Sequence, residues 1–563
     1  MEEATKTESP TGKGAGYTQR IEQNKGNVSR DEKQTMKPSF EPLKNPETLQ
    51  DINPFSNQEQ EPPAKVSVIF EELLEDFIPL DFEALAFPQI EQLREEAEKL
   101  EILCKNPDGS YNTEGQKTEW EKLKSINKQI ERFKITEKHL LILTIENVKK
   151  QAELNEWGIC KSAGFVYLFN GAYWVKVEEE TLQSFLGMAA EKMGVAKFSA
   201  RFFDFRAKLL KQFFAVSYLP TPEPPENKAL LNLKNGTLEV TPEGNKLRPF
   251  NREDFLRYQL PFEYNPEAKA PQFKAFLQRV LPDPEAQKVL SEFLGYVFVK
   301  TEHLKLEKAL LLYGTGANGK SVVFDIVNAL FGGENITSFS LEDLTDKSGY
   351  SRAEIEGKLL NYASEINGKL ETSIMKQIIS GEQVAARVIY RRPFSIKDYA
   401  KLIFNLNELP REVEHTNAFF RRLLILPFNV TIPEKEQDKQ LAKKIIKTEL
   451  SGVFNWVLEG LERLLLNKGF TDCEAIEQAR EDYKTNTDTV KLFIIENNYG
   501  QSTTETMLLK DLYLNYRTFC KEDEFAIPVK KQNFRKRLEG MGFVIEKMNT
   551  GNNVFIETTE TPF

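Results

Sequence analysis

The clearest pattern of hydrophobic and polar positions lies at residues 309–331, which read ALLLYGTGANGKSVVFDIVNALF. A continuous apolar run ends in a glycine-rich stretch. Beyond it, apolar residues recur at helical spacing, namely Val322, Val323, Ile326, Val327 and Leu330. This order predicts a buried strand, a loop and a helix in direct succession.

Four segments downstream continue an α/β pattern. Apolar runs at 357–366, 398–410 and 417–428 each predict a core strand. Between the first two, residues 371–396 predict a short helix followed by two β-like runs that meet as a hairpin. We therefore expect one α/β domain over residues 272–480.

Upstream of this domain, alternating and helical patterns predict a mixed α+β domain over residues 153–271. Residues 165–177 and 230–240 each contain two alternating runs around an Asn-Gly pair, which is typical of β-hairpins. The helical stretches between them interleave phenylalanines with Arg201, Arg206, Lys208 and Lys211. Such a mixture can bind single-stranded nucleic acid, but phenylalanines at helical spacing favour a core.

The two ends of the chain have different patterns. Residues 1–65 have almost no aliphatic content, which predicts a disordered tail. Residues 66–152 predict amphipathic helices that pack on each other. We interpret them as a helical spacer or arm, with a partner-binding or DNA-gripping module as the alternative.

Residues 485–563 predict three helices and two short β runs, the arrangement of a winged-helix domain. Its third helix is basic, with Lys530, Lys531, Arg535, Lys536 and Arg537, and we predict that it binds duplex DNA.

Composition narrows the class of protein. A length of 563 residues predicts three or four domains, and 40% hydrophobic residues are enough for their cores. Neither a long apolar run nor a secretory leader is present, so we expect a cytoplasmic protein without a membrane partner. The four cysteines lack C-x-x-C spacing and only three histidines are available, which argues against structural zinc and favours reduced cysteines. The net charge of −10 means that nucleic acid must be bound by local basic patches.

The loop within residues 309–331 fits the G-x-x-x-x-G-K-[ST] pattern of a phosphate-binding loop. Its backbone N–H groups would surround the α- and β-phosphates of ATP. Lys320 would contact the β- and γ-phosphates, and Ser321 would hold Mg²⁺. The predicted nucleotide-binding residues are Gly314, Thr315, Gly316, Ala317, Asn318, Gly319, Lys320 and Ser321.

Polar residues at the ends of the downstream strands extend this chemistry. Glu365 ends an apolar run and is the candidate catalytic base and Mg²⁺ ligand, while Asn407 is placed to contact the γ-phosphate. Arg421 and Arg422 open the last strand, where a ring ATPase needs an arginine presented to its neighbour. The predicted hairpin carries three arginines suited to contact DNA phosphates, namely Arg387, Arg391 and Arg392.

The order GTGANGKS, LLNYASEI, SGEQVAARVIYRRPFSI, LIFNLNELP and FFRRLLILPF resembles the superfamily 3 helicases. Within them it is most similar to the helicase region of phage and plasmid replication primases, which is related to the poxvirus primase-helicase. The likeness covers roughly residues 150–560. A small-molecule P-loop kinase or a GTPase would not carry an arginine-tipped hairpin between its acidic and polar strands.

The resemblance implies an AAA+ core in which Lys320 and Ser321 bind nucleotide and Glu365 is the Walker B acid. It makes Asn407 the sensor and Arg422 the arginine finger, with Arg421 as the alternative. Ser364 stands where many relatives have a second carboxylate, and Asn405 remains a rival sensor.

The predicted function is an ATP-dependent, ring-forming DNA helicase, hexameric by resemblance, which replicates a phage, plasmid or other mobile element. Single-stranded DNA would occupy the central channel and duplex DNA the winged helix. The alternative is a non-translocating AAA+ ATPase for origin recognition or remodelling. The first 150 residues contain no D-x-D pair, so primer synthesis would require a separate primase or polymerase.

Overall fold

The computed structural model describes residues 63–106, 109–162, 164–219, 228–364, 371–389, 393–410, 416–522 and 528–559. Nearly all of the predicted tail at residues 1–65 lies outside these ranges. Three predicted site residues also lie outside them, namely Glu365, Arg391 and Arg392. None of the described helices is long and apolar enough to cross a membrane.

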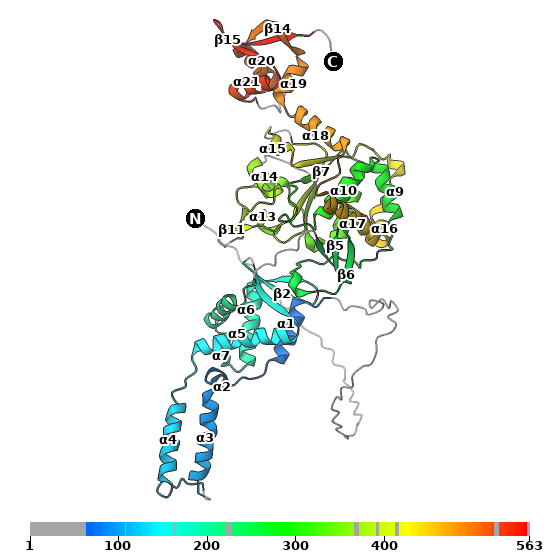
Figure 1. The fold of residues 1–563 in the computed structure, drawn as a ribbon. Helices are drawn as coiled ribbons and strands as arrows, with labels where there is room; N and C mark the ends of the chain where they lie inside the picture. The colour runs from blue at the N-terminus through cyan, green and yellow to red at the C-terminus, as the bar shows by residue number, and fades with distance from the viewer. Residues whose placement is uncertain are drawn as a thin grey trace, which may run out of the picture. The chain divides into compact units, whose positions relative to one another are not determined.

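A five-stranded parallel sheet organises the central part of the chain (Figure 1). Its strands lie in the order β13 (Leu423–Pro427), β7 (Ala309–Tyr313), β12 (Lys401–Leu406), β9 (Leu360–Ser364) and β8 (Ile336–Thr337). The first four are strands that the apolar runs predicted, and these predictions are confirmed. The two-residue β8 was not predicted, because it is too short to leave a periodic pattern.

Both faces of this sheet are covered by helices. Leu310 and Leu312 of β7 belong to one hydrophobic core, whereas Ala309 and Leu311 belong to a second, because successive strand residues point to opposite faces. Two buried faces explain why the strands read as continuous apolar runs. Figure 1 shows helices on either side of β7. The first core includes α9 (Pro271–Val280), α10 (Pro284–Tyr296), α11 (Lys320–Phe331), α16 (Leu441–Thr448) and α17 (Leu450–Asn467); the second includes α12 (Leu341–Thr345), α13 (Tyr350–Glu354), α14 (Thr372–Ile379), α15 (Asn417–Phe420) and α18 (Glu474–Asn486).

Two antiparallel hairpins that the sequence predicted are confirmed. One joins β2 (Phe165–Phe169) to β3 (Trp174–Val177), with β1 (Gly158–Ser162) along its other edge. The second joins β4 (Ala229–Leu233) to β5 (Gly236–Thr241), followed by β6 (Gly244–Arg248). Leu231 and Leu238 of the second hairpin belong to the same core as α10. Hydrophobic contacts therefore group β4–β6 with the parallel sheet, although the pattern of predicted elements indicated a domain boundary near residue 272.

A separate core joins the helices that precede β4. It contains residues of α1 (Val66–Asp76), α5 (Glu137–Leu154), α6 (Glu179–Lys192), α7 (Lys197–Arg201) and α8 (Phe203–Val216). Phe205 and Phe213 are buried in it, as predicted. The core interpretation is wrong for Phe202 and Phe203, whose exposed fractions are 55% and 73%, because they lie at the turn into α8. The remaining described N-terminal helices are α2 (Phe82–Ala86), α3 (Gln89–Cys104) and α4 (Lys117–Ile130); α3 and α4 pack on each other as the amphipathic pattern predicted.

The C-terminal segment contains the three predicted helices, namely α19 (Thr489–Glu496), α20 (Leu509–Glu522) and α21 (Lys531–Gly540). They share a core with an antiparallel sheet in the order β14 (Tyr499–Leu508), β16 (Gly551–Thr558) and β15 (Ile545–Met548). The sequence predicted the last two strands but not β14. Half of β14 is polar and exposed, so it has no apolar alternation, and its pairing with β16 defines it as a strand.

Candidate functional site

The loop between β7 and α11 has the backbone of an anion-binding site. Gly316, Ala317 and Gly319 have positive φ angles of 112°, 49° and 86°. Backbone turns of this kind direct successive N–H groups toward one concave side. The N-terminus of α11 follows at Lys320, and its first-turn N–H groups lack partners within the helix. The loop can therefore bind a phosphate.

Two glycines of the loop are required by close approach. A Cβ atom on Gly314 would lie 2.4 Å from the carbonyl oxygen of Phe428, which follows β13. A Cβ atom on Gly319 would lie 2.8 Å from Cγ1 of Val280, in addition to the strain of its positive φ. These contacts explain the first and last glycines of the G-x-x-x-x-G-K-S pattern.

The Lys320 ammonium group is held by its own loop and by the neighbouring strand. It donates to the carbonyl oxygen of Gly314 at 2.5 Å, to Oδ1 of Asn318 at 3.1 Å and to Oδ1 of Asn407 at 3.3 Å. Lys320 is only 6% exposed, and burial lowers its pKa below the usual lysine value. No carboxylate forms an ion pair with it in the described part of the chain. A buried cation surrounded by neutral oxygens favours an anionic ligand.

The two rival sensor residues have different environments. Leu406 of β12 lies beside Tyr313 of β7, so the end of β12 adjoins the loop, and Asn407 reaches Lys320 there. Asn405 is buried and accepts a hydrogen bond from the hydroxyl of Tyr362 on β9 at 2.9 Å. Of the two asparagines, the one that contacts the phosphate loop is Asn407.

This difference gives a paired prediction. Asn407→Ala should lower ATP turnover by about 10²-fold and leave the unfolding midpoint close to that of the wild type. Asn405→Ala should instead destabilise the protein by about 1–3 kcal/mol, because the Tyr362 hydroxyl loses its partner in the core. Phosphate release and urea denaturation measure the two effects. Tyr362→Phe in the Asn405→Ala background is the control and should recover part of the lost stability. Equal turnover losses in both alanine variants would contradict the assignment.

Contacts from the segment after β13 brace the loop, and the sequence pattern did not predict them. The Asn318 side chain donates to the carbonyl oxygen of Phe428 at 3.1 Å, and the backbone N–H of Ile432 donates to the carbonyl oxygen of Ala317 at 2.8 Å.

Thr315 and Ser321 are exposed at the loop. The Ser321 hydroxyl, in the first turn of α11, is therefore accessible to a metal ion bound with nucleotide.

Of the two arginines before β13, the one predicted to be the arginine finger is the buried one. The side chain of Arg422, the first choice for an arginine finger, is only 10% exposed. It donates to Oγ of Ser380 at 3.0 Å and to the carbonyl oxygen of Ala418, and it lies 3.5 Å from a carboxylate oxygen of Glu307. Arg421 is 49% exposed and forms an ion pair with Glu307 at 2.5 Å. Arg422 is thus held inside its own chain, and Arg421 is the accessible member of the pair.

The predicted arginine-bearing hairpin is confirmed by the antiparallel pairing of β10 (Val384–Ala386) with β11 (Phe394–Ile396). Its tip, with Arg391 and Arg392, lies outside the described residues. Arg387 follows β10, is exposed, and lies over the ring of Tyr350 at 5.8 Å. Of the three predicted DNA-binding arginines of the hairpin, Arg387 is the one that lies within the described residues.

The basic residues near α21 divide into two groups. Lys530, Lys531 and Lys536 are exposed, and Arg535 pairs with Glu539 on the same helix at 2.8 Å. Arg537 instead forms an ion pair with Asp488 at 2.9 Å, and the Asp488 side chain also caps α19. Arg537 therefore connects α21 to α19, whereas the three lysines remain available to solvent.

Comparison with known proteins gives two family matches and a distant relative. Residues 151–282 match a family described as D5 N terminal like, and residues 312–422 match a family of unknown function, DUF5906. “Putative helicase L207/L206” of Acanthamoeba polyphaga mimivirus is 22% identical over 331 residues, which cover 53% of this chain and 33% of the mimivirus protein. The chain therefore spans about a third of the length of this relative.

Solved structures also show a likeness. The A form apo structure of the NrS-1 C terminal region has 12% identity and a TM-score of 0.41, covering 73% of this chain and 98% of that chain. Another apo structure of the same region has 12% identity and a TM-score of 0.40, with coverage of 74% and 99%. Because both scores lie below 0.5, neither structure bears on the assignment of residues here.

The fold and the site define a mixed α/β protein with a loop of the phosphate-binding type at the carboxyl end of a strand in a parallel sheet. The family matches and the mimivirus relative fit a phage and viral primase-helicase family. They confirm the resemblance that the order of motifs predicted.

Proposed function

We propose that this protein is an AAA+ ATPase that works as a ring-forming DNA helicase in the replication of a phage, plasmid or other mobile element. The observation that carries the proposal is the position of Lys320, held between the phosphate loop and Asn407 of the adjacent strand. The name of the mimivirus relative supports a helicase-like role in replication.

The order of strands supports the AAA+ class. The phosphate-loop strand β7 lies between β13, the last strand of the sheet in sequence, and β12, the strand that ends at the polar residue Asn407. The acidic segment follows β9, which neighbours β12. The polar strand therefore lies between the phosphate-loop strand and the acidic strand, and this order supports an AAA+ core.

In the proposed mechanism, four residues have distinct roles in ATP hydrolysis. Lys320 exchanges its three neutral acceptors for phosphate oxygens, which stabilises its buried charge. Ser321 and Glu365 would hold Mg²⁺, which neutralises charge on the phosphates. Glu365 follows Ser364, the last residue of β9, and we keep it as the base that accepts a proton from the attacking water. Asn407 is released from Lys320 and orients the γ-phosphate or that water.

The arginine finger of the proposal is Arg421. A finger must reach the site of the adjacent subunit, and a half-exposed guanidinium paired with one carboxylate can do so, whereas the buried Arg422 cannot without breaking its contacts. Arg422 then acts as a positioning residue, because it shares Glu307 with Arg421 and fixes the start of β13.

The DNA contacts of the proposal come from two basic surfaces. Arg387, together with Arg391 and Arg392 at the hairpin tip, would contact single-stranded DNA in the ring. The three helices and the sheet at residues 489–559 support a winged-helix domain, in which α21 contacts duplex DNA.

A strand-displacement assay on a forked duplex tests the proposal. The full-length protein should separate the strands only with ATP and Mg²⁺, and single-stranded DNA should stimulate phosphate release. Hydrolysis stimulated by DNA without strand displacement would favour the alternative, a non-translocating remodelling ATPase. Absence of nucleotide-dependent activity in both assays would contradict the proposal.

The winged-helix assignment predicts different effects for two basic residues of α21. Lys536→Ala should weaken binding to duplex DNA severalfold and lower the slope of log affinity against log salt by about one, because one phosphate contact is lost. Arg537→Ala should mainly lower the stability of the C-terminal segment, because the carboxylate of Asp488 loses its ion-pair partner. Fluorescence anisotropy at several salt concentrations and thermal denaturation measure these effects. An unchanged salt slope in Lys536→Ala would contradict a phosphate contact at α21.

A further inference from the structure

A cavity lies at the amino ends of the strands of the parallel sheet, opposite the phosphate loop. Its volume is about 340 Å³, which is within the range of small-molecule sites. Its lining includes Lys308, Lys358 and Lys401, which stand at or just before the starts of β7, β9 and β12. The phosphate loop follows the opposite, carboxyl end of β7. The cavity, here called the basic pocket, is therefore separate from the nucleotide site.

The lining of the basic pocket carries an excess of positive charge. Seven lysines and arginines line it against four carboxylates. Three of these carboxylates are already paired, with Asp398 bound to Arg257 at 2.6 Å, Glu302 to Lys397 at 2.9 Å and Asp254 to Arg248 at 2.7 Å. The cations of the lining are Lys228, Arg257, Lys300, Lys308, Lys358, Lys397 and Lys401.

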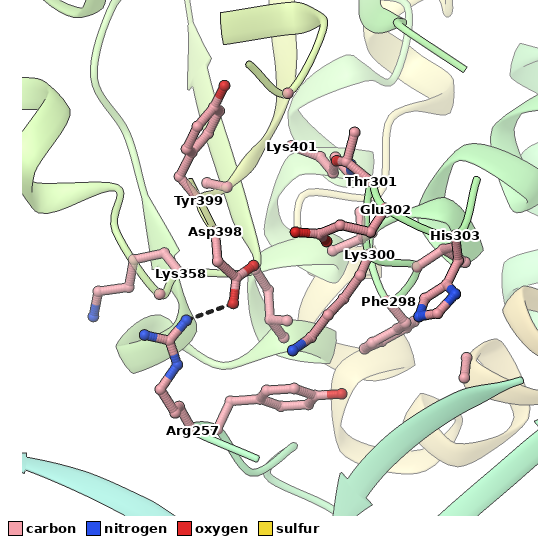
Figure 2. A pocket seen from close by; sticks show the side chains of 18 of the residues that line it. Arg257, Phe298, Lys300, Thr301, Glu302, His303, Lys358, Asp398, Tyr399 and Lys401 are labelled. Atoms are coloured by element: carbon pink, nitrogen blue, oxygen red, sulfur yellow. Dashed lines mark hydrogen bonds and ion pairs between the residues drawn. The ribbon is translucent and has the colours of Figure 1, made fainter. Parts of the chain in front are cut away.

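Four lysines of the pocket form no ion pair with a carboxylate among the described residues, and Lys308 and Lys358 donate to backbone carbonyl oxygens, which leaves Lys300 and Lys401. The Lys401 ammonium group donates to Oγ1 of Thr301 at 2.7 Å and lies 4.3 Å from the centre of the Tyr296 ring. Burial lowers its pKa to about 8, despite the opposing influence of Asp398 and Glu302. The ammonium group of Lys300 forms no hydrogen bond or ion pair within the same part of the chain, and Figure 2 shows the side chain extending across the pocket toward Arg257. Both ammonium groups would be stabilised by an anion.

The other walls suit a flat, partly apolar group. Phe298 and His303 lie side by side at one end of the pocket in Figure 2, and Leu359 and Ile378 also contribute to the lining. Nε2 of His303 is buried without a hydrogen-bond partner in the described structure. An unpaired buried ring nitrogen favours a ligand that carries its own donors or acceptors.

We propose that the basic pocket binds a phosphorylated small molecule of nucleotide size, with its phosphates on Lys300, Lys401 and Thr301 and its flat group against Phe298 and His303. Binding at this second site does not depend on helicase activity. Because Lys401 opens β12, which ends beside Asn407, an occupant of the pocket contacts the strand that reaches Lys320.

Calorimetry with ATP and with pyrophosphate tests this proposal in the full-length Lys320→Ala protein, which lacks the main phosphate-loop contact. We expect one saturable site per chain, with ATP bound more tightly than pyrophosphate because only ATP carries a base. Adding Lys300→Ala should weaken binding of both probes by about tenfold or more. Adding Lys246→Ala should leave it unchanged, because Lys246 is exposed on β6 and lies outside the pocket.

Acetylation mapping of the wild-type protein locates the site directly. ATP and pyrophosphate should slow the modification of Lys300 and leave Lys246 unaffected. The proposal is overturned if neither probe binds the Lys320→Ala protein at millimolar concentration, or if Lys300→Ala leaves both affinities unchanged. Protection of Lys300 by a single-stranded oligonucleotide alone would assign the pocket to DNA and would also overturn it. The strand-displacement assay is a separate readout, so failure of the helicase proposal is distinguishable from failure of this one.

Discussion

Replacing Lys320 with alanine is expected to abolish ATP hydrolysis, with a loss of about 10²-fold or more in turnover, while the protein stays folded. The ammonium group is the buried cation of the phosphate loop, and it contacts Asn407 on the neighbouring strand. Its removal takes away the group that would stabilise charge on the β- and γ-phosphates. The loop keeps its contacts with the segment after β13 through Asn318 and Ala317, so the cost in stability should be small.

Phosphate release and circular dichroism measure these two outcomes. The matched control is Lys246→Ala, which removes an exposed lysine of β6 and should hydrolyse ATP at the wild-type rate. Normal turnover in purified Lys320→Ala would exclude this loop from the mechanism. Loss of the circular dichroism signal would instead show that Lys320 is needed for folding.

The second large effect is expected from Arg421→Ala, which should bind ATP almost normally and lose about 10³-fold or more in hydrolysis. The guanidinium of Arg421 is 49% exposed and would complete the site of an adjacent subunit in a ring. Mixing Arg421→Ala with Lys320→Ala should restore part of the activity, because some interfaces then combine an intact loop with an intact arginine. The recovery should disappear on dilution, since a shared site requires association.

Arg422→Ala is the companion variant, and its expected effect is on stability. Its side chain contacts Ser380, Ala418 and Glu307, so truncation should lower the free energy of unfolding by about 1–3 kcal/mol. Urea denaturation measures this loss. An Arg421→Ala protein with normal hydrolysis, or mixed rings without recovery, would count against the ring arrangement and favour a monomeric P-loop enzyme.

Local chemistry was readable from the sequence because it depends on neighbouring residues. The loop of residues 314–321 needs glycines at positions of positive φ or close approach, and the Asn-Gly pairs at 170–171 and 235–236 favour tight turns between alternating runs. Four of the five strands of the parallel sheet were predicted for a similar reason, since a strand buried on both faces must be apolar throughout.

Residues with equivalent sequence signals could be distinguished only in three dimensions. Asn405 and Asn407 are both polar residues near the end of β12, but strand alternation and the position of Tyr362 place the first in the core. Arg421 and Arg422 are adjacent and chemically identical, and only packing against Ser380 and Glu307 separates the buried one from the exposed one.

The basic pocket could not be predicted from the sequence at all, because its residues come from segments spread between positions 228 and 402. No short sequence pattern contains these residues. They meet because the parallel strands all begin at the same end of the sheet, where β4 and the segments flanking the strands close the cavity. The sequence by itself determined most of the elements and the phosphate loop, since these follow from local periodicity and turn chemistry, and the order of its motifs indicated the family resemblance. The tertiary structure decided which of two like residues faces the site and where distant lysines converge, since burial and contact are properties of the packed chain.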